Sequence, residues 1–63
     1  MSNIFSLDEI IKFAIEKEKE SYELYKKLAE ITDTPKAQNL FNFLKKAELK
    51  HEKYYENLLK NIN

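Results

Sequence analysis

The chain has 63 residues and no cysteine, and eleven Lys balance eleven Asp and Glu to give no net charge at pH 7. The lack of cysteine excludes disulfides and thiolate-bound zinc or iron–sulfur sites within this sequence, and the interleaved charges leave no basic face for nucleic acid. A chain this short rarely buries enough apolar surface to be stable without a metal or a partner chain. We therefore expect any metal to be held by His, Asp and Glu.

The first fifteen residues, MSNIFSLDEIIKFAI, carry no basic leader. Asp8, Glu9 and Lys12 interrupt them before an apolar run can reach the length that a membrane span needs. We expect a soluble, cytoplasmic protein whose partners are neither nucleic acids nor membranes.

The first predicted helix covers residues 7–31. The motif Ser6-Leu7-Asp8-Glu9 is typical of a capping box, in which the Ser6 hydroxyl accepts from the first turn and Glu9 reaches back. Residues on one face then recur at spacings of three and four, as in an amphipathic helix. The apolar members of this row are Ile11, Ile15, Tyr22, Tyr25 and Ala29. Glu18 fills the remaining place in the row.

A turn at about residues 32–34 leads to a second predicted helix over about 35–62. Asp33 or Thr34 can cap this helix, and Pro35 suits its first turn, where the missing N–H is not needed. Its seam alternates steps of four and three, a spacing typical of a helix that packs in a bundle. The seam consists of Ala37, Phe41, Leu44, Glu48, His51, Tyr55, Leu58 and Ile62.

The predicted fold is all-α, an antiparallel two-helix hairpin that forms a single domain over residues 1–63. Residues whose numbers sum to about 66 should lie at the same height, which places Glu18 level with Glu48. Two helices bury only the strip between them, so their wide apolar faces would stay in water. We therefore expect a homodimer, or a higher even oligomer, in which two hairpins form a four-helix bundle.

The polar residues of the two seams predict a dinuclear metal site. A two-fold axis through the middle of the bundle would bring a second Glu18, Glu48 and His51 to the same level. Four unpaired carboxylates there would oppose folding, whereas two divalent cations match their charge and can use all six side chains as ligands. Glu16 and Glu20 lie off the apolar row, and we expect them to face solvent.

The string AIEKEKESYELYKKLAE, followed by LFNFLKKAELKH, resembles the ferritin-like superfamily and, within it, the rubrerythrin-like proteins. Proteins of that family resemble the pattern A-x₃-E-x₆-Y on one helix and E-x-x-H on the next. The pair of helices is repeated to form a four-helix bundle. Here Ala14, Glu18 and Tyr25 match the first pattern, and Glu48 with His51 matches the second. The resemblance covers nearly the whole chain but only one of the family's two halves.

The resemblance implies a di-iron centre with two iron ions per homodimer, although the same ligands also suit zinc or manganese. Glu48 and its symmetry mate would bridge the irons, Glu18 would be a terminal ligand, and His51 would cap each iron. No catalytic residue apart from these metal ligands is implied. Such a centre is compatible with ferroxidase or peroxide-reducing activity. The rubredoxin-like module of full rubrerythrins is missing from this sequence, so an enzyme of this kind would need an external electron donor.

Three tyrosines lie one or two turns from the predicted ligands. Tyr22, Tyr25 and Tyr55 could hydrogen-bond the ligands and hold them in place, or they could be core aromatics whose hydroxyls have other partners. Tyr25 has the better claim, because it alone matches the family pattern.

The residues leave two other functions open. In one, zinc or manganese fills the site only to hold the bundle together, which makes the chain a non-catalytic, metal-stabilised dimerisation module. In the other, the chain binds no metal and is a small helical interaction protein.

Overall fold

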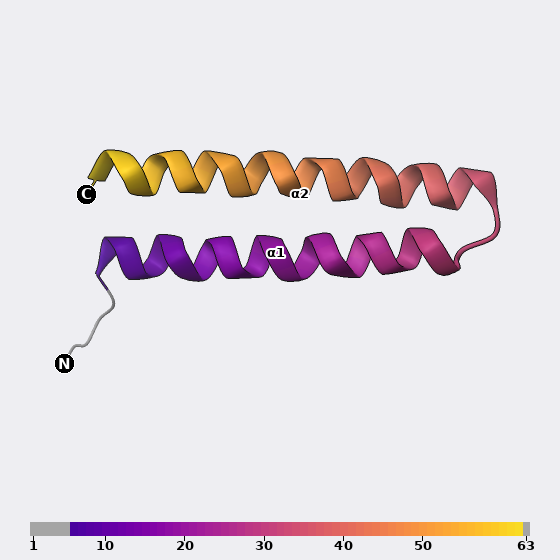
Figure 1. The fold of residues 1–63 in the computed structure, drawn as a ribbon, viewed down its shortest axis with the longest axis horizontal. Helices are drawn as coiled ribbons and strands as arrows, with labels where there is room; N and C mark the ends of the chain where they lie inside the picture. Colours follow the sequence, from indigo (N-terminus) through magenta and orange to yellow (C-terminus); the bar gives the residue numbers. More distant parts are fainter. Residues whose placement is uncertain (1–5, 63) are drawn as a thin grey trace.

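The computed structural model describes residues 6–62, which form two α-helices joined by a short turn (Figure 1). Helix α1 spans Leu7–Ile31 and helix α2 spans Pro35–Ile62. The helices run antiparallel and pack against each other, which confirms the predicted all-α hairpin. The single domain predicted over 1–63 and the absence of a basic leader both involve residues 1–5 or 63, which lie outside the described residues.

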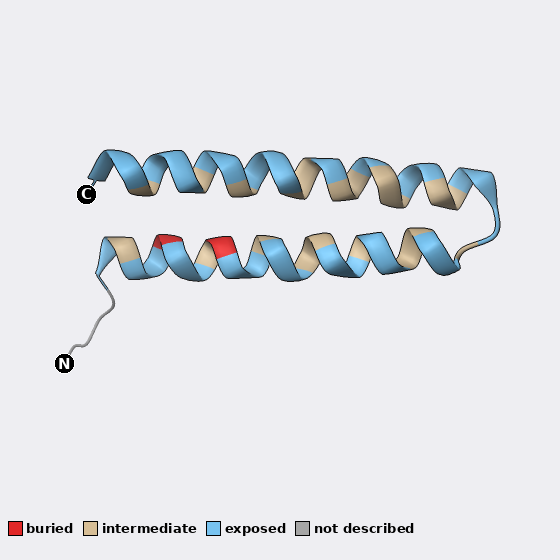
Figure 2. Cartoon of the chain, viewed as in Figure 1, coloured by how far each residue is buried: buried red, intermediate tan, exposed pale blue. Residues whose placement is uncertain are grey.

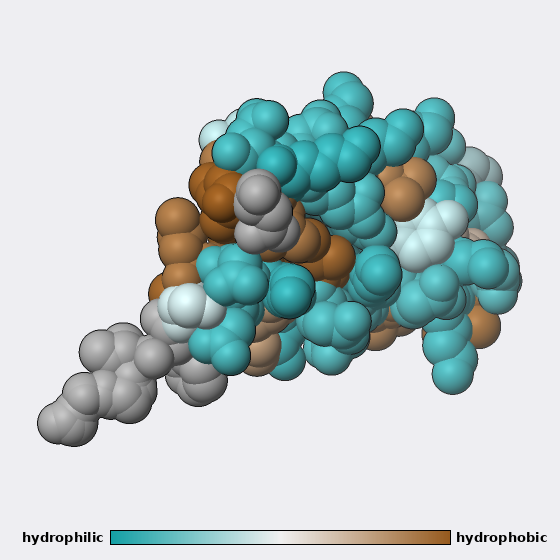
Figure 3. Space-filling view, turned by 60° about the vertical axis from the view of Figure 1, so that its left-hand side comes forward, coloured by the Kyte–Doolittle hydropathy of each residue, from teal (hydrophilic) through white to brown (hydrophobic). Residues whose placement is uncertain are grey.

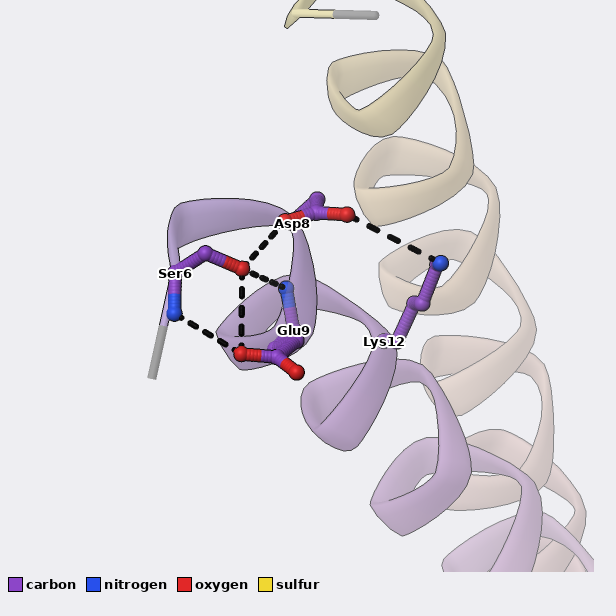
Figure 4. Close-up of polar contacts among 4 residues, drawn as sticks. All are labelled: Ser6, Asp8, Glu9 and Lys12. Carbon is purple, nitrogen blue, oxygen red and sulfur yellow. Dashed lines mark hydrogen bonds and ion pairs between the residues drawn. The ribbon is translucent and has the colours of Figure 1, made fainter. Parts of the chain in front are cut away.

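The start of α1 is fixed by the predicted capping box (Figure 4). The Ser6 backbone N–H donates to Glu9 Oε1 at 2.9 Å, and the Glu9 N–H donates to Ser6 Oγ at 3.4 Å. The Ser6 hydroxyl also donates to Asp8, and this bond holds the pKa of the Asp8 carboxyl below its usual range. Together these bonds satisfy backbone donors that have no partner within the helix.

The reversal between the helices is also set by local chemistry. The Thr32 N–H still donates to the Leu28 carbonyl at 3.1 Å, but the Thr32 backbone is extended and ends α1. Helix α2 begins at Pro35, and the Gln38 N–H donates to the Thr34 carbonyl at 3.0 Å. The Gln38 side chain donates to the Thr32 carbonyl at 2.6 Å and so joins the two sides of the turn.

The core between the helices is thin (Figure 2). Among the described residues only Ile11 and Ile15 are buried, at 5% and 8% exposure, and α2 has no buried residue. Tyr25 of α1 stacks on Phe41 of α2 with ring centroids 6.3 Å apart. The smallest dimension of the hairpin is 11 Å, about the diameter of one helix with its side chains. Residues 6–62 therefore form a single layer of two helices.

Large apolar side chains remain exposed on both helices. In Figure 3, which brings the start of α1 and the end of α2 forward, hydrophobic residues gather along one side and hydrophilic residues cover most of the other. Within residues 6–62, neither helix has an apolar stretch long enough to cross a membrane. The exposed large apolar residues are Leu7, Ile10, Phe13, Leu24, Ile31, Leu40, Phe43, Leu49, Tyr54, Leu58 and Ile62.

Candidate metal centre

The structure brings the three sequence-predicted ligands together at the middle of the hairpin. Glu18 comes from α1, while Glu48 and His51 lie one turn apart on α2. One ligand atom from each of the three side chains lies within 4.8 Å of the other two. His51 Nδ1 is 3.4 Å from Glu18 Oε1 and 3.4 Å from Glu48 Oε1. Within residues 6–62, these three side chains make up the cluster.

The two carboxylates of this cluster are poorly hydrated. The side chains of Glu18 and Glu48 are each 17% exposed. Burial raises the pKa of the Glu18 carboxyl, and the neighbouring Glu48 carboxyl raises it further, while His51 acts in the opposite direction. The charged form of Glu18 is thus disfavoured, first because its carboxyl is removed from water and then because a second carboxylate lies beside it.

One buried atom in the cluster has no partner. Glu18 Oε1 is inaccessible to solvent and has no hydrogen-bond partner among residues 6–62, although His51 Nδ1 lies 3.4 Å away. An unsatisfied buried acceptor of this kind costs about 1–3 kcal/mol, and more when it is charged. A divalent cation between the three side chains would satisfy this atom, and two carboxylate oxygens with one imidazole nitrogen suit iron, manganese or zinc. The residues present therefore fit a metal ion.

The cluster combines two half-buried carboxylates with an exposed imidazole. His51 is 57% exposed even though it is a member of the predicted seam. Three protein donors leave at least one coordination position free on a divalent cation of this type. The single chain therefore supplies an incomplete ligand set with room for further ligands.

The three tyrosines named from the sequence lie around this cluster without bonding to it. Tyr22, Tyr25 and Tyr55 are half-buried, and Tyr25 packs on Phe41 while Tyr55 meets Tyr54 edge to face with centroids 5.7 Å apart. Among the described residues, no hydrogen bond joins the three tyrosine hydroxyls to the cluster. Their proposed role in holding the ligands stays a prediction.

The acidic residues beside Glu18 lie outside the cluster. Glu16 and Glu20 are exposed, and Glu20 instead pairs with Lys17 at 3.4 Å on the surface of α1. The helical period therefore selects Glu18 from three closely spaced glutamates, as the apolar row of α1 predicts.

A family model described as Rubrerythrin matches residues 2–59, which include both clustered carboxylates and His51. Searches among curated proteins and among solved structures gave no significant match. The family match covers nearly all of α1 and α2, and it agrees with the helical hairpin and with the carboxylate and imidazole cluster described above. The chain belongs to the rubrerythrin family.

Proposed function

We propose that this chain is a ferritin-like di-iron protein that completes its metal centre by forming a homodimer and then oxidises ferrous ion or reduces peroxide. The observation that carries the proposal is the buried, unpartnered Glu18 Oε1 beside Glu48 and His51. Members of the rubrerythrin family typically bind iron, which favours iron over zinc or manganese for the same ligands.

Each chain would provide one half of the ligand set. Glu18 and Glu48 supply two negative charges, and a second chain would supply two more, which together match two divalent cations. His51 Nδ1 lies 3.4 Å from an oxygen of each carboxylate, which supports this nitrogen as the imidazole donor to the metal. A pair of bound iron ions would supply the electrons for reducing oxygen or peroxide.

The surroundings of the cluster suit this role. Ile15, one turn before Glu18, is buried and limits the approach of water along the seam. His51 and the open side of the hairpin remain accessible until a second chain covers them. A dimer would therefore both complete the ligand set and remove the site from bulk water, which strengthens the attraction between the carboxylates and the cations.

The proposal is tested by the metal content and mass of protein purified without added metal, followed by addition of ferrous ion in air. We expect about two irons per dimer and a ferric absorption band that grows faster than in buffer alone. His51→Ala should abolish the band. Glu18→Gln, which removes one charge with little change in shape, should weaken iron binding. Glu16→Gln, two residues away on the exposed side of α1, is the matched control and should behave as the native chain.

Two results would contradict the proposal in different ways. A dimer that binds zinc or manganese but oxidises ferrous ion no faster than buffer would favour the non-catalytic, metal-stabilised module. Protein that binds none of these metals with micromolar or better affinity would exclude the metal centre altogether.

A further inference from the structure

The residues on the two sides of the seam differ in kind, so the hairpin has two unlike faces. On both helices, exposed apolar residues directly precede members of the seam, as Leu24 precedes Tyr25 and Phe43 precedes Leu44. In an antiparallel pair of helices, rows that flank the seam in the same sense lie side by side. These exposed apolar rows form what we call the open apolar face, whose large exposed side chains include Ile10, Leu24, Leu40, Phe43 and Tyr54.

The opposite face, which we call the polar face, is formed by the residues that directly follow members of the seam. On α1 these residues are all charged, and on α2 five of the seven are polar or charged. The α1 residues are Lys12, Glu16, Lys19, Glu23, Lys26 and Glu30, and the α2 residues are Gln38, Asn42, Lys45, Leu49, Glu52, Glu56 and Leu59. In the proposed homodimer the second chain would cover the open apolar face, which leaves the polar face in water.

Near the turn, the polar face holds a pocket of about 390 Å³, within the range of small-molecule sites. Ala29 is level with Ala37, and two such small side chains leave space between the helices. At 1.5 Å per residue, Ala29 lies about 16 Å along α1 from Glu18, so the pocket is separate from the metal cluster. Besides Ala29, the residues that line the pocket all directly follow a seam member: Lys26, Glu30, Gln38, Asn42 and Lys45.

Three side chains of the pocket can donate hydrogen bonds to a ligand. Within residues 6–62, neither Lys26 nor Lys45 forms an ion pair, and the side-chain amide of Asn42 has no hydrogen-bond partner. Lys45 and Asn42 are half-buried, so water solvates their polar groups less fully than it solvates exposed ones. Two ammonium groups that line one pocket also repel each other, and an anion between them would offset that repulsion.

The pocket contains hydrogen-bond acceptors as well. The Gln38 amide nitrogen donates to the Thr32 carbonyl at 2.6 Å, which fixes the amide and leaves its oxygen as an acceptor. The Glu30 carboxylate is a second acceptor on the wall of the pocket. A ligand that matches both sets of groups therefore supplies negative charge and also one hydrogen-bond donor.

A neighbouring hollow on α1 has a different balance of charge. It is lined by two lysines and two glutamates, so its charges cancel: Glu23, Lys26, Lys27 and Glu30. The pocket between the helices has two lysines and one glutamate, which leaves one positive charge in excess. Of the two, the pocket between the helices is the one that favours an anion.

We propose that the pocket between the helices binds inorganic phosphate in its monohydrogen form. Lys26, Lys45 and Asn42 would donate to the phosphate oxygens, and hydrogen bonds between charged groups are stronger than neutral ones. The O–H of the phosphate would donate to Glu30 or Gln38. Sulfate has the same shape and charge but carries no proton in mildly alkaline buffer, so it would set an acceptor oxygen against these two acceptors. The pocket should therefore prefer phosphate to sulfate.

An NMR titration of the full chain as purified tests the site, with sodium phosphate and sodium sulfate compared in mildly alkaline buffer at constant ionic strength. Phosphate should cause saturable shifts of the Asn42 and Gln38 side-chain amide signals, and sulfate should need a several-fold higher concentration for the same shifts. Lys45→Gln should weaken phosphate binding by about tenfold or more, because it removes a charge-assisted hydrogen bond. Lys19→Gln is the matched control, since Lys19 lies on the same face of α1 but does not line the pocket.

Glu30→Gln separates recognition of the phosphate proton from simple attraction between charges. Loss of the carboxylate removes repulsion for both anions, but phosphate also loses an acceptor for its O–H. Sulfate should therefore gain more affinity than phosphate, and the preference for phosphate should shrink. An equal gain for both anions would refute the proposed role of Glu30.

Three results would overturn the site as a whole. Shifts that grow linearly with either anion would show that the lysines attract only a diffuse layer of counter-ions. Saturable binding that Lys45→Gln leaves unchanged would place the anion elsewhere. Shifts confined to signals around His51 would place it at the metal cluster. Because the pocket uses none of the proposed metal ligands, each of these results leaves the proposed function standing, and a chain that binds no iron leaves the phosphate site standing.

Discussion

Replacing Glu48 by leucine should make the metal-free protein more stable. The side chain of Glu48 is 17% exposed, so a leucine there would gain most of the about 1.5–3 kcal/mol that full burial of such a side chain contributes. The change also removes the carboxyl that, after burial, does most to raise the pKa of Glu18. The helix does not suffer, because leucine and glutamate have similar helix propensities.

One loss opposes this gain. His51 Nδ1 lies 3.4 Å from Glu48 Oε1 and would lose that contact, but His51 is 57% exposed and water can replace the carboxylate. Ion pairs at this exposure contribute about 0–1 kcal/mol. The net expectation is a stabilisation on the order of 1 to 4 kcal/mol, the range seen when buried ionic groups are replaced by apolar ones. Glu56→Leu, on the exposed side of α2, is the matched control and should change stability by no more than about 0.5 kcal/mol.

Urea and thermal unfolding of the native chain and of both variants would measure these changes in stability, first with chelator and then with added ferrous or zinc ion. Protomer concentration must be held constant, because unfolding is coupled to dissociation in a dimer. Metal should raise the melting temperature of the native chain and of Glu56→Leu, since it binds only the folded state, and should leave Glu48→Leu unchanged. The reasoning fails if the native melt is indifferent to metal and Glu48→Leu is neutral with chelator.

Three further results are expected. Sedimentation at micromolar concentration should show a dimer or a multiple of it, and Phe43→Glu, which puts a charge on the open apolar face, should weaken association; a folded 7.6 kDa native monomer would contradict the bundle. With chelator, the free energy of unfolding should fall as pH rises from about 4.5 through the raised folded-state pKa of Glu18, because the folded state binds that proton more tightly than the unfolded state. Unfolding measured at a series of pH values would show this fall, and Glu48→Leu should reduce it. Ser6→Ala should cost about 1 kcal/mol in urea unfolding by removing the helix cap, and an unchanged midpoint would show that the capping bonds contribute nothing.

The ends of the helices could be predicted because local chemistry determines them. Ser6 and Glu9 exchange hydrogen bonds over one turn, and Pro35 fits a first turn whatever packs around it. The reversal between Thr32 and Thr34 needs only the extended backbone at the end of α1 and a restart three residues later. None of these features depends on a distant part of the chain.

Burial could be predicted only in part, because a periodic pattern marks an apolar face without saying what covers it. Ile11 and Ile15 are buried as their places in the α1 row suggest. His51 and Leu58 belong to the α2 seam by spacing, yet they are 57% and 36% exposed in the single chain. The proposed homodimer would cover these exposed seam residues.

The cluster was predictable to the level of residues but not of atoms. Helical spacing and a turn near Asp33 suffice to set Glu18 level with Glu48. The missing hydrogen bond at Glu18 Oε1 and the approach of Nδ1 of His51 depend on side-chain torsions that no sequence pattern specifies. The sequence likewise does not determine whether iron, manganese or zinc would bind, because all three accept carboxylate and imidazole donors.

The exposed histidine and the exposed apolar rows have one physical cause. A hairpin one helix thick cannot surround a ligand cluster, so in the proposed function a second chain completes the metal site and covers the exposed apolar residues. If the metal binds the dimer more tightly than the monomer, linkage requires that metal also strengthen the dimer by the same factor. Dilution below the dimer dissociation constant should then release metal, and removal of metal should raise that dissociation constant. A metal affinity that does not change across the dissociation of the dimer would place the complete site within one chain.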